Sequence, residues 1–131
     1  MHHLVLTEEL SLAYIKKKMG FNPSFEPAGL GARWRGFLLW FTLNSPLKFK
    51  APKTVGDEHL PDRTTLAEIR TRWQKTRADW QAFFLQMPDE LAGMAIYKHP
   101  RAGRLGWPQT MAFLETHFKR HLKQVRNALK A

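Results

Sequence analysis

The sequence contains no cysteine among its 131 residues. This absence excludes disulfide bonds, thiolate metal sites and cysteine nucleophiles together. Histidine and carboxylate side chains are then the ligands left for a metal ion, and the chain has six histidines. A cysteine-free composition agrees with a reducing compartment, and we expect a cytoplasmic protein.

Long apolar runs are also missing. The densest apolar patch, residues 37–43, is far shorter than a membrane-spanning helix. The N-terminal sequence MHHLVLTEEL has neither the cationic start nor the small-residue cleavage site of a signal peptide. We therefore expect neither export nor a membrane partner.

Acidic residues are scarce, with 11 Asp and Glu against 21 Lys and Arg, which gives a formal net charge of +10. Such a charge invites a nucleic-acid interpretation. The basic residues are spread over the whole chain, however, and no zinc finger, recognition helix or RNA-binding aromatic signature accompanies them. Nucleic-acid binding is therefore the least favoured function, and solvated helix faces explain the charge better.

The apolar fraction of 44% is enough for one buried core, and we expect a single domain over residues 1–131. Apolar residues recur at helical spacing in four segments, about 2–18, 30–43, 65–87 and 108–131. Thr65 and Glu68 match a capping box, and Pro108 suits a first helical turn. The stretch between Pro88 and Pro108 is too rich in Gly and Pro for regular structure. The fold class is all-α, most simply a helical bundle.

Each segment has an apolar stripe that we expect to be buried. Large aromatic residues at helical spacing are ordinary packing residues, so we assign them to the core. The stripes comprise Leu6, Leu10, Ala13 and Tyr14; Leu30, Trp34, Phe37, Leu38 and Phe41; Leu66, Ile69, Trp73, Trp80, Phe83, Phe84 and Met87; and Leu114, Phe118, Leu122, Val125 and Leu129.

Two histidines stand four residues apart in the last segment, in THFKRH. His117 and His121 lie on or beside the apolar stripe, and two imidazoles one turn apart can bind one metal ion. Phe118 follows the first histidine, so this is not the HExxH metalloprotease motif. Paired histidines of this kind also occur as packing or solvent-facing residues, so the pair alone leaves both interpretations open.

A third ligand would strengthen the metal interpretation, because catalytic metal centres usually have three protein ligands and an open position. His3 shares a face with Leu6 and Leu10 and is the best candidate on geometry. His2 lies nearer the edge of that stripe. His59 falls in a polar link, and His99 precedes Pro100, where it would shape the turn and line a cleft.

The order of short motifs along nearly the whole chain resembles the DinB-like superfamily. In that family a His-Leu pair is followed by an acid, a later segment has His-Pro-x-x-Gly, and the last helix has HxxRH followed by Gln. The parallels here are His3-Leu4 with Glu8, His99-Pro100 with Gly103, and His117, Arg120, His121 and Gln124, together with KFKAP at residues 48–52 and Trp73.

The resemblance implies an up-down-down-up four-helix bundle with a divalent metal ion, Zn²⁺, Ni²⁺ or Fe²⁺, on His3, His117 and His121. It implies a thiol S-transferase or a hydrolase, in which the metal activates a low-molecular-weight thiol or water to attack a small molecule. Glu8 or Arg120 could act nearby, although Arg120 falls off the inward stripe and better suits a salt bridge. A non-catalytic or decayed metal-binding bundle is the alternative. No catalytic residue is assigned.

Family members begin with a full helix before the His-Leu helix, whereas this chain begins at Met1, two residues before His3. We therefore expect a bundle that lacks the family's first helix. An apolar groove left by that helix would favour a homodimer.

Overall fold

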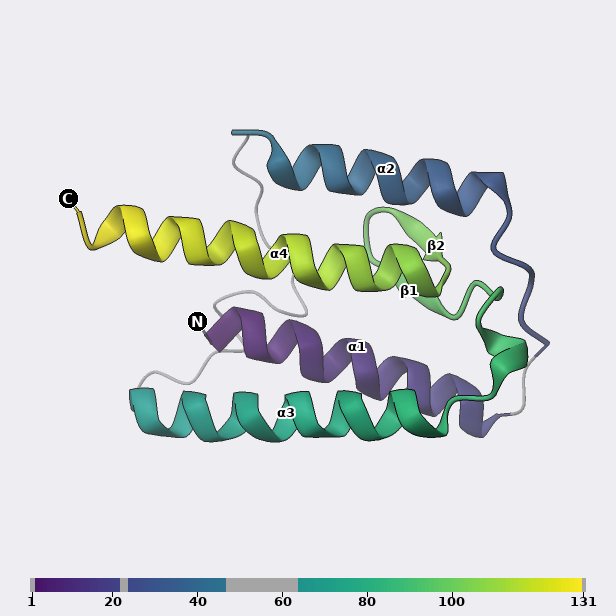
Figure 1. Ribbon diagram of the computed structural model, residues 1–131, viewed down its shortest axis with the longest axis horizontal. Helices are drawn as coiled ribbons and strands as arrows, with labels where there is room; N and C mark the ends of the chain where they lie inside the picture. The colour runs from purple at the N-terminus through teal and green to yellow at the C-terminus, as the bar shows by residue number, and fades with distance from the viewer. Residues whose placement is uncertain (1, 22–23, 47–63, 131) are drawn as a thin grey trace.

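A computed structural model describes residues 2–21, 24–46 and 64–130. The protein is mostly helical with four α-helices in these ranges, as expected (Figure 1). No helix within them is both long and apolar enough to cross a membrane. The elements follow in the order α1 (His2–Gly20), α2 (Leu30–Asn44), α3 (Leu66–Gln86), η3 (Asp89–Leu91), β1 (Tyr97–His99), β2 (Gly103–Leu105) and α4 (Trp107–Ala128).

The helix boundaries follow local sequence signals. The Thr65 side chain accepts a hydrogen bond from the Glu68 backbone N–H, and the Glu68 carboxylate accepts one from the Thr65 N–H at 2.7 Å. This is the predicted capping box at the start of α3. Pro108 lies in the first turn of α4, where a missing N–H costs nothing. These starts therefore agree with the sequence-based prediction.

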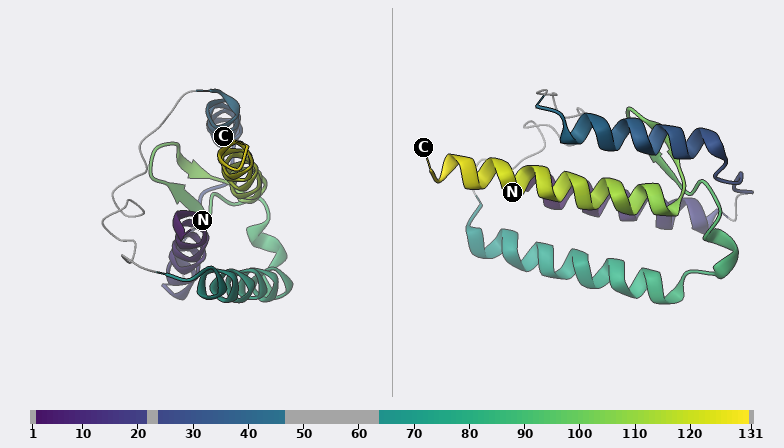
Figure 2. Two further views of the ribbon diagram at one scale, coloured as in Figure 1. Left: turned by 90° about the vertical axis from the view of Figure 1, so that its left-hand side faces the viewer. Right: turned by 45° about the horizontal axis from the view of Figure 1, so that its top comes forward.

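Figure 1 shows α1 and α3 running in one direction and α2 and α4 in the opposite one. Taken in order, the four helices alternate, so they do not themselves trace the up-down-down-up course that the resemblance implies. Among the described residues, the motifs behind that resemblance lie in α1, the β1–β2 hairpin and α4, with Trp73 in α3, and none of them lies in α2. Seen end-on in Figure 2, α2 packs against α4, and α1 against α3.

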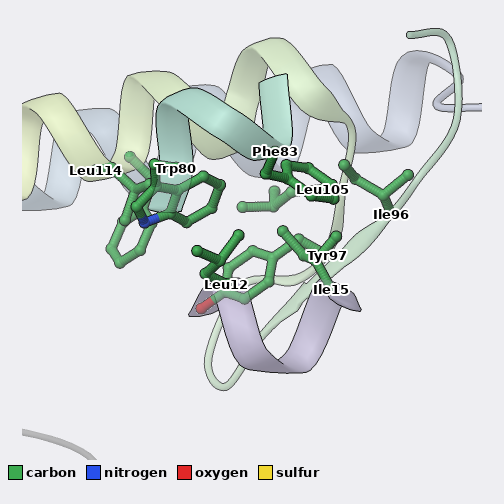
Figure 3. Close-up of a cluster of buried hydrophobic side chains, with 9 residues drawn as sticks. Leu12, Ile15, Trp80, Phe83, Ile96, Tyr97, Leu105 and Leu114 are labelled. Carbon is green, nitrogen blue, oxygen red and sulfur yellow. The ribbon is translucent and has the colours of Figure 1, made fainter. Parts of the chain in front are cut away.

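The main core lies between α1, α3, α4 and the hairpin (Figure 3). On α1 the buried face differs from the predicted one, because Leu10 is 42% exposed whereas Leu4 and Ile15 are at most 1% exposed. On α3, Trp80 and Phe83 are buried as predicted, but Leu66 is 73% exposed. The core cluster comprises Leu12, Ile15, Trp80, Phe83, Ile96, Tyr97, Leu105, Phe113 and Leu114.

The predicted core stripe of α2 is exposed to solvent. Trp34 and Phe41 are each 60% exposed, and Phe37 is 50% exposed. The opposite face of α2, with Ala32 and Leu39, turns inward. Helical spacing identifies an apolar stripe but not which side a neighbouring helix covers, so the prediction for α2 was wrong.

The end of α4 departs from prediction in a similar way. Leu114 is buried, but Val125 is 37% exposed and Leu129 is 83% exposed. Figure 1 shows the last turns of α4 extending past the start of α1, so these turns have no partner among the other labelled helices.

The stretch between Pro88 and Pro108 contains regular structure that the sequence did not predict. β1 and β2 pair antiparallel, with Tyr97 opposite Leu105 and His99 opposite Gly103. Gly103 has a φ of 81°, a conformation that side chains rarely adopt. Pro100 lies in the turn between the strands. Pro100 and Gly103, which argued against regular structure, therefore form the turn and the first β2 residue of a hairpin whose strands are too short to show alternation.

Candidate metal centre

The fold brings His3, His117 and His121 together. One ring nitrogen from each lies within 4.8 Å of the others, so the three side chains could hold a metal ion. His3 comes from the first turn of α1, and the other two come from consecutive turns of α4. The ring centroid of His3 is 5.3 Å from that of His117 and 5.3 Å from that of His121.

The spacing of the α4 pair is close to that of two ligands on one ion. The Nε2 atoms of His117 and His121 are 3.1 Å apart. A tetrahedral Zn²⁺ with Zn–N bonds of about 2.0–2.1 Å places two ligand nitrogens about 3.3 Å apart. The donor set therefore fits Zn²⁺, and a modest movement of His3 towards the pair would complete three ligands.

Burial keeps the α4 imidazoles neutral, as metal ligation requires. It lowers the pKa of His117 to about 3, with further lowering from the neighbouring His121 and His3. It also lowers the pKa of His121 to about 4, and a hydrogen bond with the Gln124 side chain acts in the opposite direction. At neutral pH a metal ion would not have to displace a proton from either ring.

The surroundings of the two α4 rings differ. The His117 ring stacks on Phe113 at a centroid distance of 5.5 Å, and its Nδ1 is buried with no hydrogen-bond partner among the described residues. His121 has Gln124 as a neighbour, one turn along the helix. Metal-bound histidines are usually oriented by a hydrogen bond at their second ring nitrogen. For His117, packing against Phe113 orients the ring instead.

The three histidines line a cavity of about 620 Å³ between α1, α2, α4 and the hairpin. Its volume falls within the range of small-molecule sites. Leu10 and Tyr14 of α1, two of the four residues predicted to face the core, form part of its wall. Leu38, Leu39 and Phe113 add further apolar surface.

His2 and His99 do not join the three. His2 Nε2 lies 2.8 Å from Nη1 of Arg72 on α3. His99 is buried on β1, where its Nδ1 accepts hydrogen bonds from the backbone N–H groups of Arg101 and Ala102. It shapes the turn and lines the cavity, as predicted, and burial lowers its pKa to about 4. His59 and the KFKAP segment lie outside the described residues.

Glu8 and Arg120 differ from the expected arrangement. Glu8 is 1% exposed and pairs with Arg77 at 2.7 Å, in a second hollow of about 350 Å³ against α3. It does not line the histidine cavity. Arg120 does line that cavity, and its Nη1 donates to the carbonyl oxygens of Leu43 and Ser45 at 2.6 and 3.0 Å. A cation here satisfies the C-terminal end of α2.

Sequence reasoning missed the contribution of α2 and the hairpin to the cavity. Arg35, Lys98 and Arg101 all lie on its wall. Nothing in the local sequence distinguishes these basic residues from the many others. Only the packing of α2 beside the hairpin brings them together.

Comparison of the chain with protein-family models, curated proteins and solved structures finds no significant match.

Proposed function

We propose that the protein is a metal-dependent enzyme, a thiol S-transferase or a hydrolase, with a divalent ion on His3, His117 and His121. The observation that carries this proposal is the convergence of three imidazole nitrogens within 4.8 Å at the wall of a cavity of small-molecule size. Three protein ligands leave a coordination position open towards that cavity.

Kinship with the DinB-like superfamily is part of the proposal, and the helix directions support it. If α1 corresponds to the His-Leu helix, which is the family's second, then α2 belongs to the connection between the second and third helices. The remaining helices α1, α3 and α4 then run down, down and up (Figure 1). This is the family's course without its first helix.

A bound divalent ion would lower the pKa of a coordinated thiol or water and so supply a nucleophile near neutral pH. The protein's own residues would do the rest. The apolar walls formed by Leu10, Leu38 and Phe113 would exclude water from the body of a substrate. The Arg120 guanidinium, fixed by two carbonyl oxygens on the wall of the same cavity, would place a positive charge near a developing oxyanion. Imidazole ligands suit Zn²⁺, Ni²⁺ and Fe²⁺.

The test is the metal content of protein purified without chelator or nickel resin, measured by plasma mass spectrometry. We expect about one divalent ion per chain in the wild type and a loss of this ion in His117→Ala. His2→Ala is the matched control, because His2 lies beside His3 in sequence but contacts Arg72 instead. It should retain the ion.

Activity is then measured on the loaded protein with two model reactions. One is transfer of a low-molecular-weight thiol to 1-chloro-2,4-dinitrobenzene, and the other is hydrolysis of p-nitrophenyl acetate. Turnover that disappears in His117→Ala and persists in His2→Ala supports an enzyme. A bound ion without turnover in either reaction would favour the non-catalytic alternative, and a folded wild type that binds no ion would refute the metal site.

Self-association is a second part of the proposal, supported by the exposed face of α2. Six large apolar side chains on this helix are 44–80% exposed, namely Leu30, Trp34, Phe37, Leu38, Trp40 and Phe41. At half exposure such side chains present roughly 600 Å² of apolar surface, and a stable interface buries about 800 Å² per partner. A second copy of the chain packed α2 against α2 would cover most of this face.

A further inference from the structure

The charged residues on the wall of the histidine cavity are all cationic in the part of the chain that the structure describes. They come from separate elements, with Arg35 on α2, Lys98 on β1, Arg101 in the hairpin turn and Arg120 on α4. Apolar walls of low polarizability concentrate the field of such charges inside a cleft. A ligand that enters the cavity therefore meets a positive potential before any metal ion adds to it.

Arg35 is held in a fixed position between α2 and the hairpin. Its Nε donates a hydrogen bond to the Arg104 carbonyl oxygen at 2.9 Å. A guanidinium bound through Nε keeps its planar fork oriented, with Nη1 and Nη2 left to bind a partner. These two nitrogens have no hydrogen-bond acceptor among the described residues.

Two glycines make room for this side chain. A Cβ atom on Gly103 would lie 3.5 Å from Arg35 Cδ, and one on Gly31 would lie 3.2 Å from Arg35 Nη1. The second distance is tighter than ordinary van der Waals contact. The Arg35 side chain therefore passes two residues that have no side-chain atoms. Neither residue displaces its guanidinium from the cavity wall.

Apolar side chains also line the cavity. They include Leu38 and Leu39 of α2 and Leu10 and Tyr14 of α1. A ligand that satisfies both features has a carboxylate at one end and an apolar body at the other. Two parallel N–H···O bonds from Nη1 and Nη2 match the geometry of a carboxylate.

We propose that the cavity binds small organic acids, with the ligand's carboxylate on Arg35 and its apolar body between α1 and α2. This inference rests on the proposed function in that it takes the cavity as the substrate site, and it names the class of substrate. The three histidines line the same cavity, so a bound acid and the proposed metal ion would share it.

The test is a calorimetric titration of the protein, as purified and again after EDTA treatment, with phenylalkanoates from benzoate to 4-phenylbutyrate. Each acid is paired with the alcohol of the same carbon skeleton. We expect at least one acid to bind about tenfold or more tightly than its alcohol, because only the carboxylate gains the charge-assisted bonds. The acid's affinity should also fall with added salt.

Three variants then test whether Arg35 causes the preference for the acid over the alcohol. Arg35→Gln should lose about tenfold in affinity for the acid and change the alcohol's affinity little. Arg35→Lys should retain part of the preference, since a lysine keeps the charge but not the planar fork. Arg33→Gln is the matched control, because Arg33 is an exposed residue of the same helix that does not line the cavity.

Equal affinity for acid and alcohol in the wild type, or no binding of either, would overturn the proposal whether or not the variants fold. An acid preference that survives in Arg35→Gln would overturn the assignment to Arg35. The titration after EDTA contains no metal, so absence of the proposed ion would not affect it. The metal proposal and the organic-acid proposal can therefore fail separately.

Discussion

The Nε2 atoms of His117 and His121 lie 3.1 Å apart on consecutive turns of α4, and both rings are held neutral by burial. Two neutral imidazoles at this distance share one proton position between them, so one ring donates and the other accepts. A divalent ion would take the place of that hydrogen bond, and the donating ring would then carry its proton on Nδ1 instead. His117 and His121 are thus already oriented to bind one ion, and His3 is the ligand that must move.

A metal ion should therefore stabilise the folded protein. At a free Zn²⁺ concentration about a hundredfold above Kd, binding adds about 2.7 kcal/mol to the free energy of unfolding. We expect the melting temperature measured by calorimetry to rise by several degrees in the wild type and in His2→Ala. His3→Ala and His121→Ala should show little or no rise. An equal rise in all four proteins would mean that Zn²⁺ binds elsewhere.

Acid should destabilise the protein well before carboxylates titrate. The pKa values of His117, His121 and His99 are about 3, 4 and 4 in the folded state, against about 6.5 in an unfolded chain. Below about pH 6.5 the unfolded state binds more protons, so the free energy of unfolding falls as pH falls, by about 1.4 kcal/mol per pH unit for each ring. For these three rings, the free energy of unfolding keeps its full value above about pH 6.5. It falls progressively as the pH is lowered towards the pKa values of the folded state.

Urea unfolding in metal-free buffer between about pH 7 and pH 5 measures this slope. The His2→Ala variant keeps all three buried rings and should give the same slope as the wild type. A free energy of unfolding that stays constant over this range would show that the rings are solvated in the folded state.

Gly103→Ala should destabilise the hairpin. Its φ of 81° costs an alanine about 1–2 kcal/mol, and the added methyl group would lie 3.5 Å from Arg35 Cδ. Gly93→Ala is the control, because Gly93 has no positive φ and nothing within 4 Å of the added atom. In chemical denaturation, the free energy of unfolding of Gly103→Ala should lie about 1–2 kcal/mol below that of Gly93→Ala. Equal stability would contradict the described backbone at β2.

Removing the partner of Glu8 should cost more than removing another arginine of α3. The Glu8 side chain is 2% exposed and its partner Arg77 is 52% exposed. Burial already raises the pKa of Glu8 against the opposing effect of Arg77. We expect Arg77→Met to lower the free energy of unfolding by about 2 kcal/mol, below the range for a fully buried pair because Arg77 reaches solvent.

The double variant Glu8→Gln/Arg77→Met removes the buried charge and should recover most of that loss. Arg70→Met, on an exposed part of α3, should cost little. Urea denaturation at neutral pH measures all three variants. If Arg77→Met is as stable as Arg70→Met, the ion pair contributes nothing to the fold.

The exposed face of α2 gives the prediction for self-association. Phe37 stacks on Trp34 at a centroid distance of 5.6 Å and lies near the middle of this face. Phe37→Glu should convert a dimer to a monomer in light scattering after size-exclusion chromatography. Leu66→Glu changes an equally apolar exposed residue on α3 and should leave the dimer intact. A monomeric wild type at high concentration would refute the dimer.

The sequence predicted the features that depend on local spacing. The start of α3 follows from the Thr65 capping box, and the start of α4 from a proline in its first turn. His117 and His121 meet because they are four residues apart on a helix. The convergence of His3 with them was also anticipated. The remaining features depend on which surfaces pack together, and local spacing does not determine this. Trp34 and Phe37 show helical periodicity whether a partner covers them or not, and Arg35 looks like any surface arginine until α2 packs beside the hairpin.

The three histidines join the first turn of α1 to the middle of α4, almost the whole length of the chain apart. The first turn of a helix opens and closes on a fast timescale, because its N–H groups have no intrahelical acceptors. Each opening would withdraw one ligand of a bound ion. The rate at which an ion leaves would therefore follow the opening rate of this turn, and the ion would exchange quickly even where its equilibrium affinity is high.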